Sequence, residues 1–250
     1  MGTSRPIPFS QSCSGPALAF GRFFDLAVGL GRGNRRQSHH LYSAGCSLVQ
    51  MTSRAAYLLL KMQALLLLAF GNRSRALSRF DHMLQLRAQD PYALASRAHV
   101  QAQDKNLVAA IMTLQQLTAA WPQDASAWFN LGYVLQQAGR HEEAEPAFLS
   151  ALAQDPRLDR AWYGLALALI EQQKFHAAVD ALEKNTALQP MSPYGWYRLA
   201  LVRLELGQPE EARKLIAHLR QFEPRVAAQL ERETGLAQTV TASGACHATQ

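Results

Sequence analysis

The stretch that decides the fold is residues 125–156, ASAWFNLGYVLQQAGRHEEAEPAFLSALAQDP. Its apolar residues recur every three or four positions in two runs, which are separated by Gly139. This is the spacing of two amphipathic helices joined by a turn. The second run stops at Pro156, and proline does not continue a helix. The stretch therefore predicts a helical hairpin.

The same pattern returns every 34 residues along most of the chain. Five repeats follow one another without insertion or deletion: 57–90, 91–124, 125–158, 159–192 and 193–226. Prolines stand at the same place in four of them, at Pro122, Pro156, Pro190 and Pro224. The twentieth position is always alanine: Ala76, Ala110, Ala144, Ala178 and Ala212. A fixed period of this length is typical of a solenoid of repeated hairpins.

The repeat positions divide into two helix faces. Positions 4, 8 and 11 share one face of the first helix, and positions 20, 24 and 27 share one face of the second. Small residues at positions 8 and 20 allow the two helices to approach, while large residues at positions 4 and 24 fill the space beside them. Gly71, Gly139 and Gly207 stand at position 15, where a positive φ ends the first helix. Pro146, early in a second helix, is expected to kink it or to delay its start.

This pattern resembles the tetratricopeptide repeat (TPR) family. The third repeat carries the resemblance best, through Trp128, Leu131, Gly132, Ala144, Phe148, Ala151 and Pro156. The first two repeats match less well, since Gln63, Ala88, Arg97 and Gln101 replace the usual residues. The resemblance implies an all-α fold, a right-handed solenoid of antiparallel helix hairpins. It also implies a scaffold that binds a protein or peptide partner in a concave groove lined by the first helices.

The resemblance also implies which side chains face that groove. Transferred position by position, they are Phe129, Asn130, Tyr133, Arg160, Tyr163, Tyr194, Tyr197 and Arg198. Aromatic and arginine side chains are the types that most often carry interface energy. We expect an extended or helical peptide of apolar or mixed composition, with the arginines orienting a carboxylate. For each tyrosine taken singly, packing against a neighbouring helix is an equal alternative.

The net charge of +6 lies mostly outside the repeats. Residues 1–56 contain six arginines and one acidic residue, whereas residues 57–226 contain 18 basic and 16 acidic residues. A nucleic-acid-binding domain is expected to carry a clustered basic face. The near-neutral array therefore gives no support for a nucleic-acid partner.

The sequence contains no motif for catalysis, for a cofactor or for a metal. HExxH and GxxxxGK[ST] are absent, and Cys13, Cys46 and Cys246 match neither a metal site nor a disulfide framework. The segments before and after the array are about fifty and two dozen residues long, too short for a separate catalytic domain. We therefore expect a protein that is not an enzyme and that has no cofactor.

The ends of the chain differ from the array. Residues 1–50 are rich in Ser, Gly and Arg and are predicted to be disordered; the change in composition there is compatible with a true start at Met51. Residues 227–235 are expected to form a short solvating cap helix that stops at Gly235. Residues 236–250 are predicted to be a disordered tail.

Residues 55–70 admit two interpretations. Their many leucines suit a membrane anchor, but Lys61 and Gln63 lie in the middle, and a charge at the bilayer centre costs about 2.5–3.5 kcal/mol. The 34-residue register assigns the segment to the first repeat, so we favour a repeat helix, a cytoplasmic protein and no membrane contact. The Ala-, Leu-, Arg- and Gln-rich composition is typical of bacteria. The alternative is a bacterial envelope assembly or secretion factor or chaperone, anchored in the inner membrane through 55–70.

Overall fold

The computed structural model describes residues 40–236, and side chains from residue 54 onward. The chain divides into two compact units, Met1–Leu48 and Val49–Gln250. The described residues form helices and no strand. In chain order the helices are α1 (His40–Ala69), α2 (Arg73–Leu86), α3 (Pro91–Gln103), α4 (Leu107–Ala120), α5 (Ala125–Gln137), α6 (His141–Gln154), α7 (Asp159–Glu171), α8 (Phe175–Leu188), α9 (Pro193–Glu205), α10 (Pro209–Phe222) and α11 (Pro224–Thr234).

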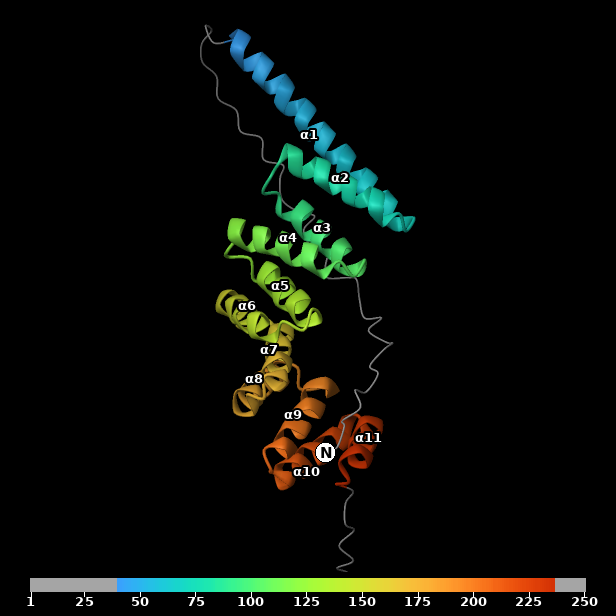
Figure 1. Ribbon diagram of the computed structural model, residues 1–250, viewed down its shortest axis with the longest axis vertical. Coiled ribbons are helices and arrows are strands. Elements are labelled where there is room, and N and C mark those ends of the chain that lie inside the picture. The colour runs from blue at the N-terminus through green and yellow to red at the C-terminus, as the bar shows by residue number, and fades with distance from the viewer. Residues whose placement is uncertain (1–39, 237–250) are drawn as a thin grey trace, which may run out of the picture. The chain divides into compact units, whose positions relative to one another are not determined.

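Each helix packs against its neighbours in the chain, which is the arrangement of a solenoid (Figure 1). Within the repeats α3 packs on α4, α5 on α6, α7 on α8 and α9 on α10, and each second helix also contacts the first helix that follows. Tyr57 and Ala64 of α1 share a buried cluster with Ala76 and Phe80 of α2. The predicted all-α solenoid of helix hairpins is therefore confirmed.

Short polar side chains begin several of the helices. Asp90 accepts a hydrogen bond from the backbone N–H of Ala93 at 2.8 Å, and Asp124 accepts one from Ser126 at 2.9 Å. Both aspartates occupy the last position of a repeat, directly before the first helix of the next. An N-cap side chain satisfies a backbone donor that has no partner within its helix. The sequence register thus fixes where these helices start.

Every turn between the two helices of a repeat contains a residue with positive φ at position 15. Three are the glycines that the sequence pattern indicated, Gly71, Gly139 and Gly207, with φ of 74°, 73° and 70°. The other two are Lys105 and Gln173, with φ of 63° and 60°. The turn prediction is confirmed for the glycines. The two non-glycine turns carry the steric strain that L-residues have in this region.

Phe148 of α6 holds two first helices at a fixed separation. Its side chain is fully buried between the backbones of Gly132 in α5 and Gly164 in α7. A Cβ atom at Gly132 would lie 2.9 Å from the phenyl ring, and one at Gly164 would lie 2.5 Å from it. Real Cβ atoms do not approach this closely. The joint between the third and fourth repeats therefore requires glycine on both sides of the ring.

Tryptophan side chains fasten the later joints between repeats. Each indole Nε1–H donates to the carbonyl of the proline that ends the preceding repeat: Trp128 to Pro122 at 2.9 Å, Trp162 to Pro156 at 2.9 Å and Trp196 to Pro190 at 2.8 Å.

The first joint is fastened differently. Ala88 and Leu94 replace the proline and the tryptophan there, and Trp121, from the end of the second repeat, donates to the carbonyl of Gln89 at 2.9 Å. One indole therefore contacts each of the four joints.

The structure differs from the sequence prediction at three places. Helix α1 begins at His40, so residues 40–50 of the segment predicted to be disordered are helical. No proline interrupts them, and extending an existing helix costs less free energy than starting a new one. Residues 1–39 lie outside the described part. Helix α6 runs from His141 through Pro146 without delay, because proline removes only one bond near the helix start. Helix α11 begins at Pro224, which both ends the last repeat and supplies a first helical residue.

Helix α11 covers the end of the last repeat. It packs on α10 and α9, and its Ala227 and Leu230 are fully buried. It stops at Gly235, which has a φ of 69°. Among the described helices, none combines the length and apolar character needed to cross a bilayer.

The turn strain gives a pair of opposite predictions. Gln173→Gly should raise the free energy of unfolding by about 0.5–1 kcal/mol, because relief of the left-handed strain exceeds the entropy cost of glycine. Gly139→Ala should lower it by about 1–2 kcal/mol. Urea denaturation followed by circular dichroism measures both. Gln137→Gly, in the helix nearby, is the control and should lower stability by about 1 kcal/mol. A loss of stability in Gln173→Gly would contradict the strain.

The glycine–phenyl contact gives a second prediction. Gly164→Ala should lower the free energy of unfolding by about 1–3 kcal/mol, since the added methyl overpacks against Phe148. Phe148→Leu makes room for that methyl, so the double variant should lose less than the sum of the two single losses. Strict additivity in the same urea titration would show that the two residues are not in contact.

Candidate functional site

The predicted groove residues lie on the first helices α5, α7 and α9. Two contacts show how such residues meet between repeats. The Arg160 guanidinium carbon lies 5.1 Å from the ring centroid of Phe129, and the Lys61 ammonium nitrogen lies 3.8 Å from that of Tyr92. In both pairs, position 5 of one repeat adjoins position 2 of the next. Neighbouring repeats therefore bring these two positions side by side.

Phe129, Tyr133 and Arg160 form the best-defined part of this surface. The rings of Phe129 and Tyr133 stack with centroids 6.3 Å apart and an interplanar angle of 22°. Phe129 also contacts the buried ring of Phe148, with centroids 6.1 Å apart. Tyr133 remains 50% exposed. Phe129 is thus anchored in the core, while Tyr133 and Arg160 face solvent.

Tyr163 and Tyr194 occupy the positions of Phe129 and Arg160, respectively, one repeat further along the array. Tyr163 is half-buried and packs against the main hydrophobic core, whereas Tyr194 is 60% exposed. Packing between helices therefore accounts for much of Tyr163. Tyr194 has most of its side chain available to a partner.

Tyr197 is engaged within the protein. Its hydroxyl donates a hydrogen bond to the Glu233 carboxylate of α11. Partial burial, followed by this bond and the charge of Glu233, raises the pKa of Tyr197 to about 12. Tyr197 therefore joins the last repeat to its capping helix.

Three polar side chains on the surface form neither an ion pair nor a hydrogen bond with the described residues. Arg160 and Arg198 form no ion pair with the described residues, and the amide of Asn130 forms no hydrogen bond with them. Other first-helix arginines are paired: Arg97 lies 3.2 Å from Asp81, and Arg203 lies 2.6 Å from Glu183. The polar groups of this surface thus retain their hydrogen-bonding capacity.

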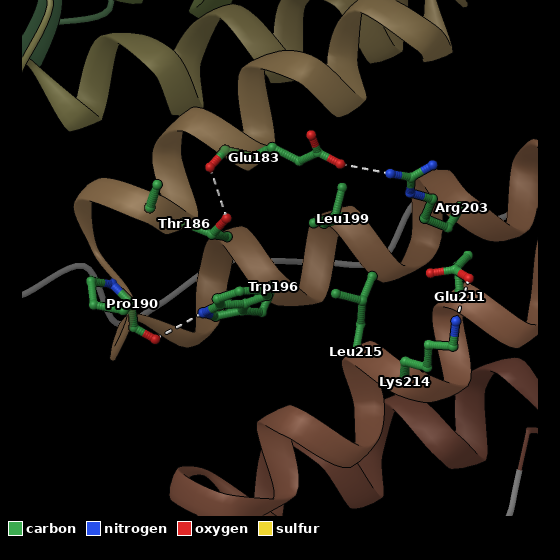
Figure 2. A pocket seen from close by; sticks show the side chains of 10 residues that line it. Glu183, Thr186, Pro190, Trp196, Leu199, Arg203, Glu211, Lys214 and Leu215 are labelled. Carbon is green, nitrogen blue, oxygen red and sulfur yellow. Dashed lines mark hydrogen bonds and ion pairs between the residues drawn. The ribbon is translucent and has the colours of Figure 1, made fainter.

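A separate pocket of 470 Å³ lies between α8, α9 and α10 (Figure 2). Trp196, Leu199 and Leu215 supply its apolar lining. The indole of Trp196 is turned toward Pro190, whose carbonyl accepts its hydrogen bond.

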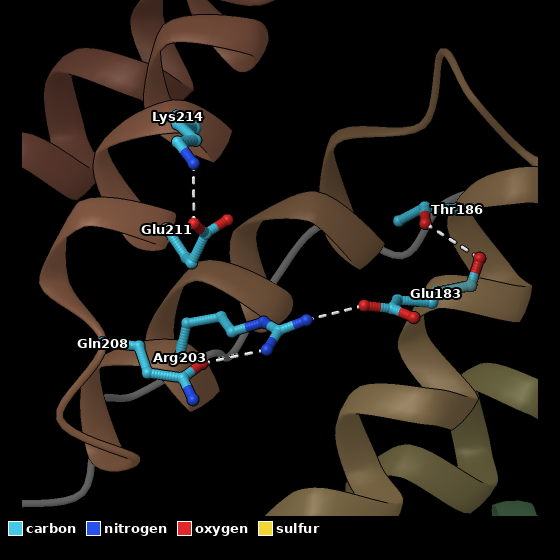
Figure 3. Close-up of polar contacts among 6 residues, drawn as sticks. All are labelled: Glu183, Thr186, Arg203, Gln208, Glu211 and Lys214. Carbon is cyan, nitrogen blue, oxygen red and sulfur yellow. Dashed lines mark hydrogen bonds and ion pairs between the residues drawn. The ribbon is translucent and has the colours of Figure 1, made fainter.

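Charged residues at this pocket are paired with one another (Figure 3). Arg203 donates to Glu183 at 2.6 Å and to Gln208 at 2.9 Å, and Lys214 donates to Glu211 at 2.6 Å. The pairs neutralise each other, which leaves little charge for a ligand.

Sequence reasoning missed this pocket, although one residue signals it. Arg203 stands at position 11, where the third and fourth repeats have the buried Leu135 and Leu169. A charged side chain at a core position has to turn toward the surface. The departure from the apolar pattern therefore marked the place where the packing opens.

The comparisons with known proteins agree with this architecture. Two tetratricopeptide-repeat models match, over residues 109–159 and 135–196. MamA from Desulfovibrio magneticus RS-1 superposes with a TM-score of 0.62 at 20% identity, over 71% of this chain and 96% of that one. YrrB, described as a TPR protein with an unusual peptide-binding site, has a TM-score of 0.60 at 18% identity, over 68% of this chain and 88% of that one.

At these identities the structural likeness concerns the fold. No curated protein sequence matches this chain. The 34-residue period, the paired helices and the family matches nevertheless indicate the same kind of repeat. The helical array of this chain is therefore an array of tetratricopeptide repeats.

Proposed function

We propose that this protein is a non-enzymatic scaffold that binds a peptide segment of a partner protein on its first-helix surface. We define this surface as the solvent-facing side of α5, α7 and α9, with these residues: Phe129, Asn130, Tyr133, Arg160, Tyr163, Tyr194 and Arg198. Tyr197 lies at its border, where it is bound to Glu233. TPR proteins as a class bind proteins or peptides, which supports the general assignment.

The observation that carries the proposal is the pattern of exposure on this surface. Tyr133 and Tyr194 are 50% and 60% exposed, and Arg160, also exposed, belongs to the helix between theirs. Large aromatic side chains and arginine are the common anchors of protein interfaces. Their spacing over the first helices of three successive repeats suits a ligand that extends along the array.

The chemistry of the surface indicates a peptide of mixed composition. The two tyrosine rings offer apolar area together with a hydroxyl. The Arg160 guanidinium lies over the face of the Phe129 ring in a cation–π contact, which orients it. A guanidinium without an acidic partner binds a carboxylate through two parallel hydrogen bonds. The Asn130 amide can both donate to and accept from a peptide backbone. We therefore expect apolar side chains in the ligand, next to an acidic side chain or a C-terminus.

Removal of the exposed rings should weaken partner binding. Tyr133→Ala combined with Tyr194→Ala should reduce partner recovery by at least about tenfold, because both rings act as anchors. Affinity purification of the tagged full chain with quantitative mass spectrometry measures this. Met112→Ala on α4, which is 59% exposed but lies on a second helix, is the matched control and should recover the partners fully. Unchanged recovery by the double tyrosine variant would refute the site.

The arginines should determine the preference for an acidic ligand. With a recovered peptide, Arg160→Gln should weaken binding about tenfold, because the carboxylate loses its charged donor. Amidation of the peptide's acidic group should remove most of the difference between wild type and variant. Fluorescence anisotropy at two salt concentrations measures both effects. Equal losses with the charged and the amidated peptide would show that Arg160 contributes packing only.

A further inference from the structure

Helix α1 has an apolar face that the array does not cover. Its Tyr57 and Ala64 are buried against α2, as the first repeat requires. The opposite side carries five large apolar side chains that are 44–60% exposed: Leu58, Leu59, Met62, Leu65 and Leu66. Phe70, in the turn that follows, is 85% exposed.

The other repeats show that this exposure is peculiar to α1. At position 3, where α1 has Leu59, the later repeats have small buried residues: Ala93, Ala127, Ala161 and Gly195. At position 10, where α1 has Leu66, they have Val100, Val134, Ala168 and Val202, all 4% exposed or less. These positions lie under the second helix of the preceding repeat. In α1 the side chains at both positions, Leu59 and Leu66, are exposed, and the residue at position 3 is large instead of small.

The exposed residues form one continuous strip. At 100° per residue, Ala55, Leu58, Leu59, Met62, Leu65, Leu66 and Ala69 together span an arc of about 120°. All seven are exposed in the structure. Arg54, also exposed, lies at one edge of the arc. The strip is therefore apolar across its width and has a basic residue at one border.

One basic residue, Arg54, borders this strip, and acidic residues are missing from it. The sequence contains no Asp or Glu between Asp25 and Asp81. On α2, Asp81 pairs with Arg97 of α3 and so faces the second repeat. Arg75, Arg79 and His82 lie about 100° or more around α2 from Asp81, away from that repeat. The apolar strip and these basic side chains thus share the same end of the array.

We propose that this end of the array lies on an anionic lipid bilayer, with α1 in the plane of the membrane. We define the α1 end surface by its apolar strip and by Arg54 and Arg75. An apolar helix face with basic residues at its edge is the kind of surface that binds in the headgroup region, without crossing the bilayer. Basic side chains add to the attraction of anionic lipids. A second copy of the chain fits less well, because like charges would then face each other.

This assignment reconciles the two interpretations of residues 55–70. The buried side of α1 is the first repeat helix, and the exposed side contacts the membrane surface. No transmembrane segment is required, in agreement with the absence of a spanning helix among the described residues. The array then remains in the aqueous phase with its first-helix surface in repeats three to five accessible.

Vesicle flotation of the full chain tests the proposal. The vesicles contain either phosphatidylcholine alone or phosphatidylcholine with about 30% phosphatidylglycerol, which gives them a negative surface potential. The wild type should float with the anionic vesicles and not with the neutral ones, and binding should fall as NaCl increases. Leu59→Gln with Leu66→Gln should reduce binding at least about tenfold. Arg54→Gln with Arg75→Gln should reduce it by about fivefold per residue.

The controls distinguish this surface from the rest of the chain. Val108→Gln with Met112→Gln alters two residues of α4 that are 69% and 59% exposed, and it should bind like the wild type. All variants should keep the helical circular dichroism spectrum. Wild-type flotation that persists in the Leu59 and Leu66 variant would assign binding to another segment and overturn the proposal. A second result would also overturn it. In that case the wild type does not float with vesicles and sediments as a dimer at equilibrium, whereas the Leu59 and Leu66 variant sediments as a monomer.

Discussion

Close approach between helix backbones is the constraint on which this array depends. Alanine at position 20 is fully buried in all five repeats, at Ala76, Ala110, Ala144, Ala178 and Ala212. A larger side chain there would separate the two helices of a hairpin and would displace every later repeat. Phe148 shows the same constraint between repeats, since its ring fits only against glycine backbone on both sides. Small residues thus set the spacing, and large residues fill what remains.

The geometry of the first-helix surface follows from this regular spacing. Because each repeat is placed against the next in the same way, position 5 of one repeat adjoins position 2 of the following repeat. The Lys61–Tyr92 and Phe129–Arg160 contacts share this geometry, although the cation is on opposite partners. The fold therefore provides a series of equivalent positions, and the residue types at them set the chemistry of each part of the surface. Tyr133, Arg160 and Tyr194 give repeats three to five their distinct chemistry.

The sequence predicted the helices, their pairing and three of the turns, because these depend on local periodicity and on glycine. It did not identify Lys105 and Gln173 as positive-φ residues, because backbone hydrogen bonds close these two turns without a glycine: Asn106 donates to Gln101 and Lys174 to Leu169, both at 2.9 Å. It assigned Tyr197 to the expected groove but could not reveal its hydrogen bond to Glu233, which depends on how α11 packs on α9. The helical start of α1 at His40 and the pocket beside Arg203 likewise depend on three-dimensional context.

The distribution of tryptophan has a practical consequence. The chain has four tryptophans, and each donates its indole N–H to a carbonyl at a different joint between repeats: Trp121, Trp128, Trp162 and Trp196. Solenoid stability is approximately a sum of repeat and nearest-neighbour interface terms, so the joints are the natural units of opening. In variants that retain a single tryptophan, intrinsic fluorescence would therefore report the unfolding of one joint between repeats at a time.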